Sequence, residues 1–125
     1  MTHAHNGYRT TRATTASPRQ VERELLRGIA ARIDGAEGYA PLAAALQENT
    51  ALWTALAVDL AGDANGLTPE LKGGLLGLAR FVVAHTRAVL AGEADAAVLS
   101  SVNRTVAAGL DPRAASGPAP TEEAA

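Results

Sequence analysis

Apolar residues recur at three- and four-residue intervals in four segments of the chain, the spacing that places side chains on one face of an α-helix. In the first segment the recurring residues are Val21, Leu25, Leu26, Ile29 and Ile33. In the second they are Leu42, Leu46, Leu52, Trp53, Leu56 and Leu60, with the polar Asn49 at one of the same helical positions. The pattern predicts that both segments form amphipathic helices, each with one buried stripe.

The third segment is apolar over a wider arc than the others. Its first row consists of Leu71, Leu75, Leu78, Val82, His85 and Val89, and a second row beside it consists of Leu76, Ala79, Val83, Thr86 and Leu90. Because a helix that is apolar over so wide an arc can be buried on several sides, we expect it at the centre of the fold. The fourth segment, at about 95–108, has a narrower stripe of Leu99, Val102 and Val106.

Local signals mark where these helices begin and end. Ser17 precedes Pro18, and Gln20 follows three positions after Ser17, which predicts an N-cap with a capping box. Thr68 and Pro69 predict the same kind of start for the third helix, and the second is expected to start near Pro41. The expected stops are Gly35 and Gly38, Gly62, Gly92 and Gly109.

We therefore expect an all-α protein, a compact antiparallel bundle of about four helices. The periodicity also allows three long helices with a short fourth packed across one end. The helical domain is expected at 17–110. Residues 1–16 lack an apolar period and are expected to form a flexible arm, while residues 111–125, with three prolines, are expected to form a disordered tail.

Composition and charge narrow the possible functions. The 125 residues include no cysteine, which excludes disulfides, thiolate nucleophiles and Cys-ligated zinc. The net charge of -2 argues against broad nucleic-acid binding, although the first third of the chain is rich in arginine. The first residues lack the apolar core of a signal peptide, and no run of about 18 uncharged apolar residues is present. We therefore expect a cytoplasmic protein without a membrane span.

Titratable side chains give little indication of catalysis. His85 falls on the apolar face of the third helix, and no other His, Asp or Glu stands at ligand or triad spacing from it, so we expect it to be a buried hydrogen-bonding residue. Glu22 is expected to pair with Arg19 or Arg23 at the surface. No phosphate-binding or nucleophile-elbow glycine motif is present. We expect no catalytic residue, no metal, no cofactor and no enzymatic activity.

Two helix faces are candidates for contact with other macromolecules. Arg19, Arg23 and Arg27 recur every four residues, a pattern typical of a solvated face but also suited to an acidic partner helix or to RNA. No aromatic stacking platform accompanies them, which counts against RNA. In the third helix the glycines at 73, 74 and 77 indicate tight packing or local softness, or alternatively a groove where a partner docks.

Trp53 is expected to lie in the core, because a single tryptophan in a helical bundle is a large apolar side chain. Its indole N–H then needs an acceptor, and Asn49, one turn earlier, is a candidate.

Four stretches of the chain, taken in order, resemble the flagellar biosynthesis regulator FlaF family of bacteria. They are Tyr8 with the segment 15–22, then 49–56 with Asp59 and Leu60, then 65–67 leading into 78–82 and 85–86, and finally 102–104 with Gly109 and Leu110. The resemblance covers about residues 8–110. Gln20, at a position where the family usually has Glu, and the later proline at 69 depart from the family pattern.

The resemblance implies a role in flagellum biogenesis that promotes flagellin synthesis or secretion. It implies flagellin as the partner, with this protein as its chaperone, and a role with or against FlbT, a regulator of flagellin mRNA translation. Direct binding to flagellin mRNA is the alternative. The residues expected to contact a partner are Arg19, Arg23, Arg27, Asn49, Trp53 and Asn103.

Overall fold

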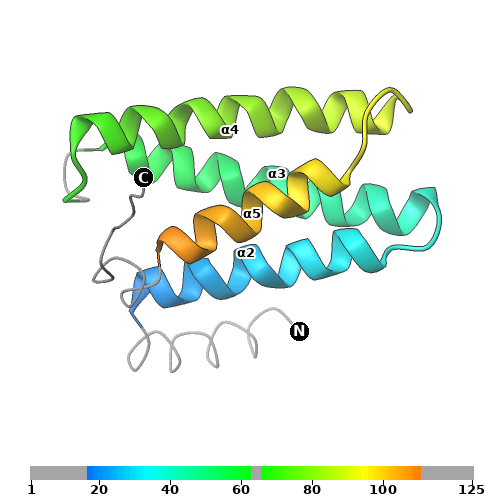
Figure 1. Cartoon of the computed structure of the whole chain (residues 1–125), viewed down its shortest axis with the longest axis horizontal. Coiled ribbons are helices and arrows are strands. Elements are labelled where there is room, and N and C mark those ends of the chain that lie inside the picture. Colours follow the sequence, from blue (N-terminus) through cyan, green and yellow to red (C-terminus); the bar gives the residue numbers. More distant parts are fainter. Residues whose placement is uncertain (1–16, 63–65, 111–125) are drawn as a thin grey trace, which may run out of the picture.

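Four antiparallel helices make up the computed structural model, which describes residues 17–62 and 66–110. They are α2 (Pro18–Gly35), α3 (Tyr39–Ala61), α4 (Pro69–Leu90) and α5 (Ala97–Gly109). Successive helices run in opposite directions, and no strand occurs among the described residues (Figure 1). This confirms the all-α bundle. The predicted arm (1–16) and tail (111–125) lie outside the described residues.

The helix ends follow the local signals closely. The Ser17 hydroxyl accepts a hydrogen bond from the Gln20 amide, and the Gln20 side chain accepts one from the Ser17 amide, which completes the predicted capping box. Thr68 caps α4 by accepting from the Leu71 amide. Gly92, at φ 77°, ends α4 in a left-handed turn in which the Glu93 amide donates to the Ala88 carbonyl. Only α3 starts earlier than expected, at Tyr39, after Gly38 at φ 104°.

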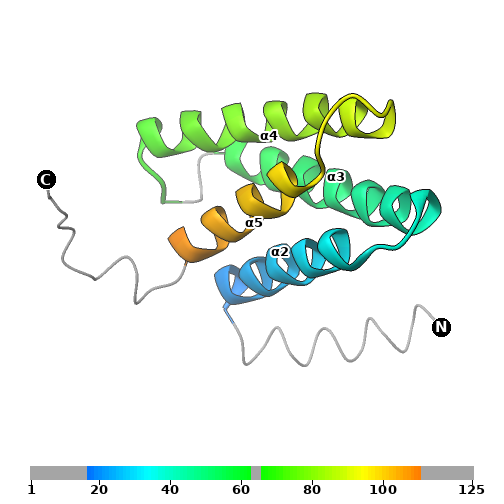
Figure 2. The same ribbon diagram turned by 45° about the vertical axis from the view of Figure 1, so that its right-hand side comes forward.

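Packing is uneven around the bundle. The first and last helices, α2 and α5, make the most extensive contact, α3 packs against both α2 and α4, and α4 touches α5 very little. Figures 1 and 2 show α4 as the outermost helix on one side, with α5 running obliquely between α4 and α2. The expectation that the third helix is central is therefore wrong, because α4 packs mainly against α3.

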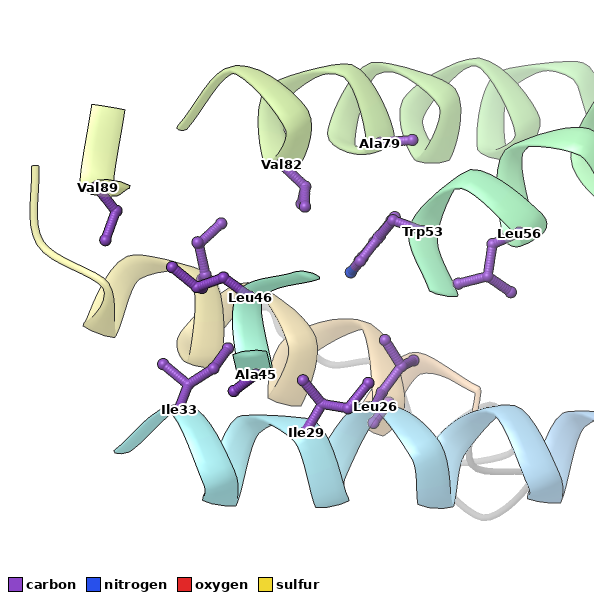
Figure 3. Packing of buried hydrophobic residues seen from close by; sticks show 12 residues of the cluster. Leu26, Ile29, Ile33, Ala45, Leu46, Trp53, Leu56, Ala79, Val82 and Val89 are labelled. Atoms are coloured by element: carbon purple, nitrogen blue, oxygen red, sulfur yellow. The ribbon is translucent and has the colours of Figure 1, made fainter. Parts of the chain in front are cut away.

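The core lies where α2, α3 and α5 meet, and α4 covers one side of it (Figure 3). Its buried apolar side chains include Leu26, Ile29, Ile33, Leu46, Trp53, Val82 and Leu99. Two predicted stripe residues are well exposed: Leu25 is 47% exposed and Leu71 is 50% exposed. Later members of the same predicted stripes, Ile29 and Ile33 in α2 and Val82 and Val89 in α4, are buried.

The glycines of α4 do not mark a tight helix contact. A β-carbon added at Gly73, Gly74 or Gly77 would meet no atom within 4 Å. All three positions are exposed. The prediction of tight packing is therefore wrong, and the structural effect that remains is a locally weaker helix.

Candidate functional site

A hydrogen-bonded polar group lies at the centre of the core. The Trp53 indole Nε1–H donates to Asn103 Oδ1 at 2.9 Å. The Asn103 Nδ2 group donates to Asn49 Oδ1 at 2.7 Å and to the Leu26 carbonyl at 3.2 Å. These four residues come from α2, α3 and α5, so one side chain, that of Asn103, connects three helices. The acceptor for the indole is therefore Asn103 rather than the predicted Asn49, although Trp53 is in the core as expected.

This arrangement changes the interpretation of three predicted partner-binding residues. Asn49 and Asn103 are 0% exposed and Trp53 is 1% exposed, so none of them presents a surface to another protein. Their role in the folded bundle is structural. Asn103 was missed as a core residue because it follows Val102, the apolar residue that the sequence pattern places in the buried stripe. In the structure the buried face of α5 consists of Leu99, Ser100, Asn103 and Ala107.

The three arginines of α2 lie in three different environments. Arg19 forms an ion pair with Glu22 at 3.2 Å, as expected. Arg23 is half-buried, and its Nη1 is enclosed without a hydrogen-bond partner among the described residues. Arg27 is exposed. These arginines therefore do not form one uniform solvated face, and their predicted contact with a partner stays a prediction.

A second polar cluster fixes α5 against α2. The Ser100 hydroxyl donates to Asp34 Oδ1 at 2.6 Å, and Arg104 Nη2 lies 2.7 Å from Asp34 Oδ2. The hydrogen bond from Ser100 and then the interaction with Arg104 lower the pKa of Asp34 below its usual value, because both favour the charged carboxylate. Together with Asn103, this cluster orients α5 so that its opposite side faces away from α2.

That opposite side of α5 and the facing side of α4 form an apolar hollow, which we term the α4–α5 groove. Its volume is about 400 Å³. It is lined by Leu78 of α4 and by Ala97, Val98, Ser101, Val102, Thr105 and Val106 of α5. No lining residue is charged. Figures 1 and 2 show α5 close to α4 at its first turn and further from it at its last, so the two helices diverge along the groove.

His85 and Tyr39 join elements at the end where α4 finishes. The His85 ring stacks on Phe81 with centroids 5.1 Å apart, and its Nε2 lies 3.0 Å from the Asp95 carbonyl oxygen in the α4–α5 connection. The Tyr39 hydroxyl donates to the Leu90 carbonyl at 3.2 Å. His85 is half-buried rather than buried as expected, and its ring lies within hydrogen-bond distance of the backbone, as expected.

A larger hollow of about 840 Å³ lies between α2 and α3, but its lining is of a different kind. Arg32 and Glu48 line it and form an ion pair across it. Among residues 17–62 and 66–110, no group of three His, Asp or Glu side chains is placed to hold a metal ion. The chemistry that the α4–α5 groove offers is therefore burial of an apolar surface, and this groove is the candidate binding site.

Comparison with known proteins identifies one family. The model for the flagellar protein FlaF matches residues 4–110, which is most of the chain and includes all four helices. No curated protein and no solved structure matches it.

Proposed function

The chain belongs to the FlaF family of flagellar proteins, and on this premise we propose that it binds flagellin as a cytoplasmic chaperone. Membership gives it a role in flagellum biogenesis and its regulation, in a family that is not one of known enzymes. The finer proposal is that it shields an aggregation-prone flagellin segment. By doing so it promotes flagellin synthesis or secretion.

The observation that supports this proposal is the uncharged lining of the α4–α5 groove. An amphipathic helix binds a protein by laying its apolar face into such a groove, with anchor residues spaced three and four apart. Val98, Val102 and Val106 present their side chains on one face of α5 at the same four-residue spacing. We therefore propose that a helical flagellin segment packs between these valines and Leu78 of α4.

We also propose FlbT as a partner that regulates flagellin together with or against this protein. It would do so either by direct contact with this protein or through flagellin. Direct binding to flagellin mRNA is less favoured, because Arg19 is paired with Glu22 and Arg32 with Glu48, and Arg23 is partly enclosed. Free, clustered cations are what an RNA backbone needs.

The test is calorimetry of the full chain with purified flagellin and, separately, with the flagellin mRNA leader. We expect saturable binding to flagellin only. The substitution Val98→Asp puts a charge at the rim of the groove, where Val98 is 38% exposed. Placing that charge against an apolar partner costs at least the roughly 1–3 kcal/mol of an unpaired polar group, so flagellin affinity is expected to fall by about tenfold or more.

The matched control is Val58→Asp, the same substitution on the outer face of α3, where Val58 is 72% exposed. This variant is expected to keep the affinity of the unsubstituted protein. Equal weakening by both variants would remove the groove as the site, and binding to the mRNA leader without binding to flagellin would overturn the proposed function.

A further inference from the structure

One side of α4 faces away from the rest of the bundle. By length and composition α4 is apolar enough to cross a membrane, yet only 22% of its most apolar 18-residue window is buried. It packs mainly against α3, and its outer side faces away from the other three helices in Figures 1 and 2. Among the Leu, Val, Phe and Ala residues of α4, Leu71, Phe81 and Ala84 are exposed, and the others are buried or half-buried. Exposed apolar side chains beside basic ones mark a surface suited to contact with another phase or molecule.

Charge on this helix has a single sign after its first turn. From Leu71 to Gly92 the charged residues are Lys72, Arg80 and Arg87, with no Asp or Glu, although the whole chain has a net charge of -2. Arg80 and Arg87 are seven residues apart, which is two helical turns, so both point to the same side. Both are exposed, as are Phe81 and Ala84 beside them. We term these four residues the outer face of α4.

We propose that the outer face of α4 lies on an anionic membrane surface. Helices that bind in the plane of a membrane interface combine an apolar strip with Lys or Arg, whose stems bury while their charged ends reach the lipid phosphates. Phe81, 40% exposed, is the aromatic side chain that enters the headgroup region, and the two guanidinium groups are complementary to anionic lipid headgroups.

The bound helix lies along the surface rather than across the membrane. Val82 and Val89, on the opposite side of α4, are buried in the core, and spanning the bilayer would require their removal from it. The three arginines of α2 lack this combination, because Arg19 is paired and Arg23 is partly enclosed. This surface is separate from the α4–α5 groove, so the inference holds whether or not flagellin is the partner.

The test is sedimentation of the full chain with two kinds of vesicle, one of phosphatidylcholine alone and one of phosphatidylcholine mixed with phosphatidylglycerol. We expect binding only to the mixed vesicles, and its loss as salt rises from 0.1 M to 1 M, where the screening length falls from about 10 Å to about 3 Å. Each basic residue near an anionic surface contributes about 1 kcal/mol, so Arg80→Gln with Arg87→Gln should lower the partition coefficient about 30-fold.

The control is Arg27→Gln with Arg32→Gln, which removes the same charge from α2 and should leave partition nearly unchanged. A Phe81→Trp variant reports the contact directly, because its emission should shift to the blue on addition of mixed vesicles while buried Trp53 gives a constant background. No binding to mixed vesicles, equal weakening by the two double variants, or an unshifted emission would each overturn the proposal. The proposal would also be overturned if the Arg80→Gln, Arg87→Gln variant changed the oligomeric mass of the protein without changing its binding to vesicles.

Discussion

Asn103 is the residue on which the interior most depends, because its amide, on α5, is hydrogen-bonded to groups on both α2 and α3. Replacing a buried hydrogen-bonding side chain costs most when its partners are left enclosed without water. Loss of Asn103 strands the Trp53 indole N–H and the Asn49 amide together. Loss of Asn49 strands only one hydrogen of Asn103, since Asn49 Nδ2 has no hydrogen-bond partner among the described residues.

We therefore predict that Asn103→Ala lowers the free energy of unfolding by about 3–5 kcal/mol and Asn49→Ala by about 1–3 kcal/mol. Urea unfolding of the two variants, followed by circular dichroism, measures both values. The order of the two effects is the sharper part of the prediction. A larger loss in Asn49→Ala would mean that Asn103 is not the centre of the network.

Asp34 makes the free energy of unfolding depend on pH. Its pKa is lowered in the folded protein, first by the hydrogen bond from Ser100 and then by Arg104. A carboxyl group with a lowered folded pKa stabilises the fold above its unfolded pKa of about 3.9, and this contribution is lost as the pH falls through the folded pKa. We predict that the stability difference between the unsubstituted protein and Asp34→Ala is full near neutral pH and shrinks below about pH 4.

The cause of the lowered Asp34 pKa can be tested separately from its effect on stability. In Ser100→Ala the Asp34 carboxyl keeps Arg104 but loses its strongest hydrogen bond, so its pKa, followed by NMR, should rise toward the ordinary value. Identical titration of Asp34 in Ser100→Ala and in the unsubstituted protein would show that Ser100 is not the main cause.

At the scale of single helices, α4 is the helix in which glycine substitutions are expected to raise the stability of the protein. An alanine at Gly73, Gly74 or Gly77 adds a methyl group to open space and restricts the unfolded chain. Each Gly→Ala change there should raise the free energy of unfolding by about 0.5–1 kcal/mol, as measured by urea unfolding.

Gly92 provides the contrast, because its φ of 77° lies in the left-handed region that alanine avoids. Gly92→Ala should destabilise the protein although its added methyl group also meets open space. Stabilisation by Gly92→Ala, or no gain from the three α4 variants, would contradict this account.

Helix ends could be predicted from the sequence because they depend on a few neighbouring residues. The capping residues Ser17, Gln20, Thr68 and Gly92 each act within one helical turn, so their spacing in the sequence predicts where the helices begin and end. The buried face of each helix was harder to predict. In α2 the adjacent residues Leu25 and Leu26 are both apolar, and the packing of α3 and α5 buries Leu26 and leaves Leu25 exposed.

At the scale of the whole molecule, the number of helices and their antiparallel order could be predicted, but the position of α4 could not. A wide apolar arc predicts burial within the bundle, whereas the structure leaves one side of α4 open and another beside the α4–α5 groove. Apolar residues that line a surface groove show the same hydrophobic periodicity in the sequence as apolar residues of the core. The groove was unpredictable for this reason, since Val102 and Val106 were assigned wholly to the core.

The pairing of the first helix with the last has a consequence for how the chain folds. The bonds from Asn103 to Leu26 and from Ser100 to Asp34 join residues that are 77 and 66 positions apart. Closing so long a loop lowers the chain entropy before the contacts that offset this loss can form. The α2–α3 and α3–α4 hairpins, in contrast, close over short connections. The largest helix interface is therefore the one with the most remote partners. Neither hairpin contains it, so this interface forms only in the step that brings α5 onto α2.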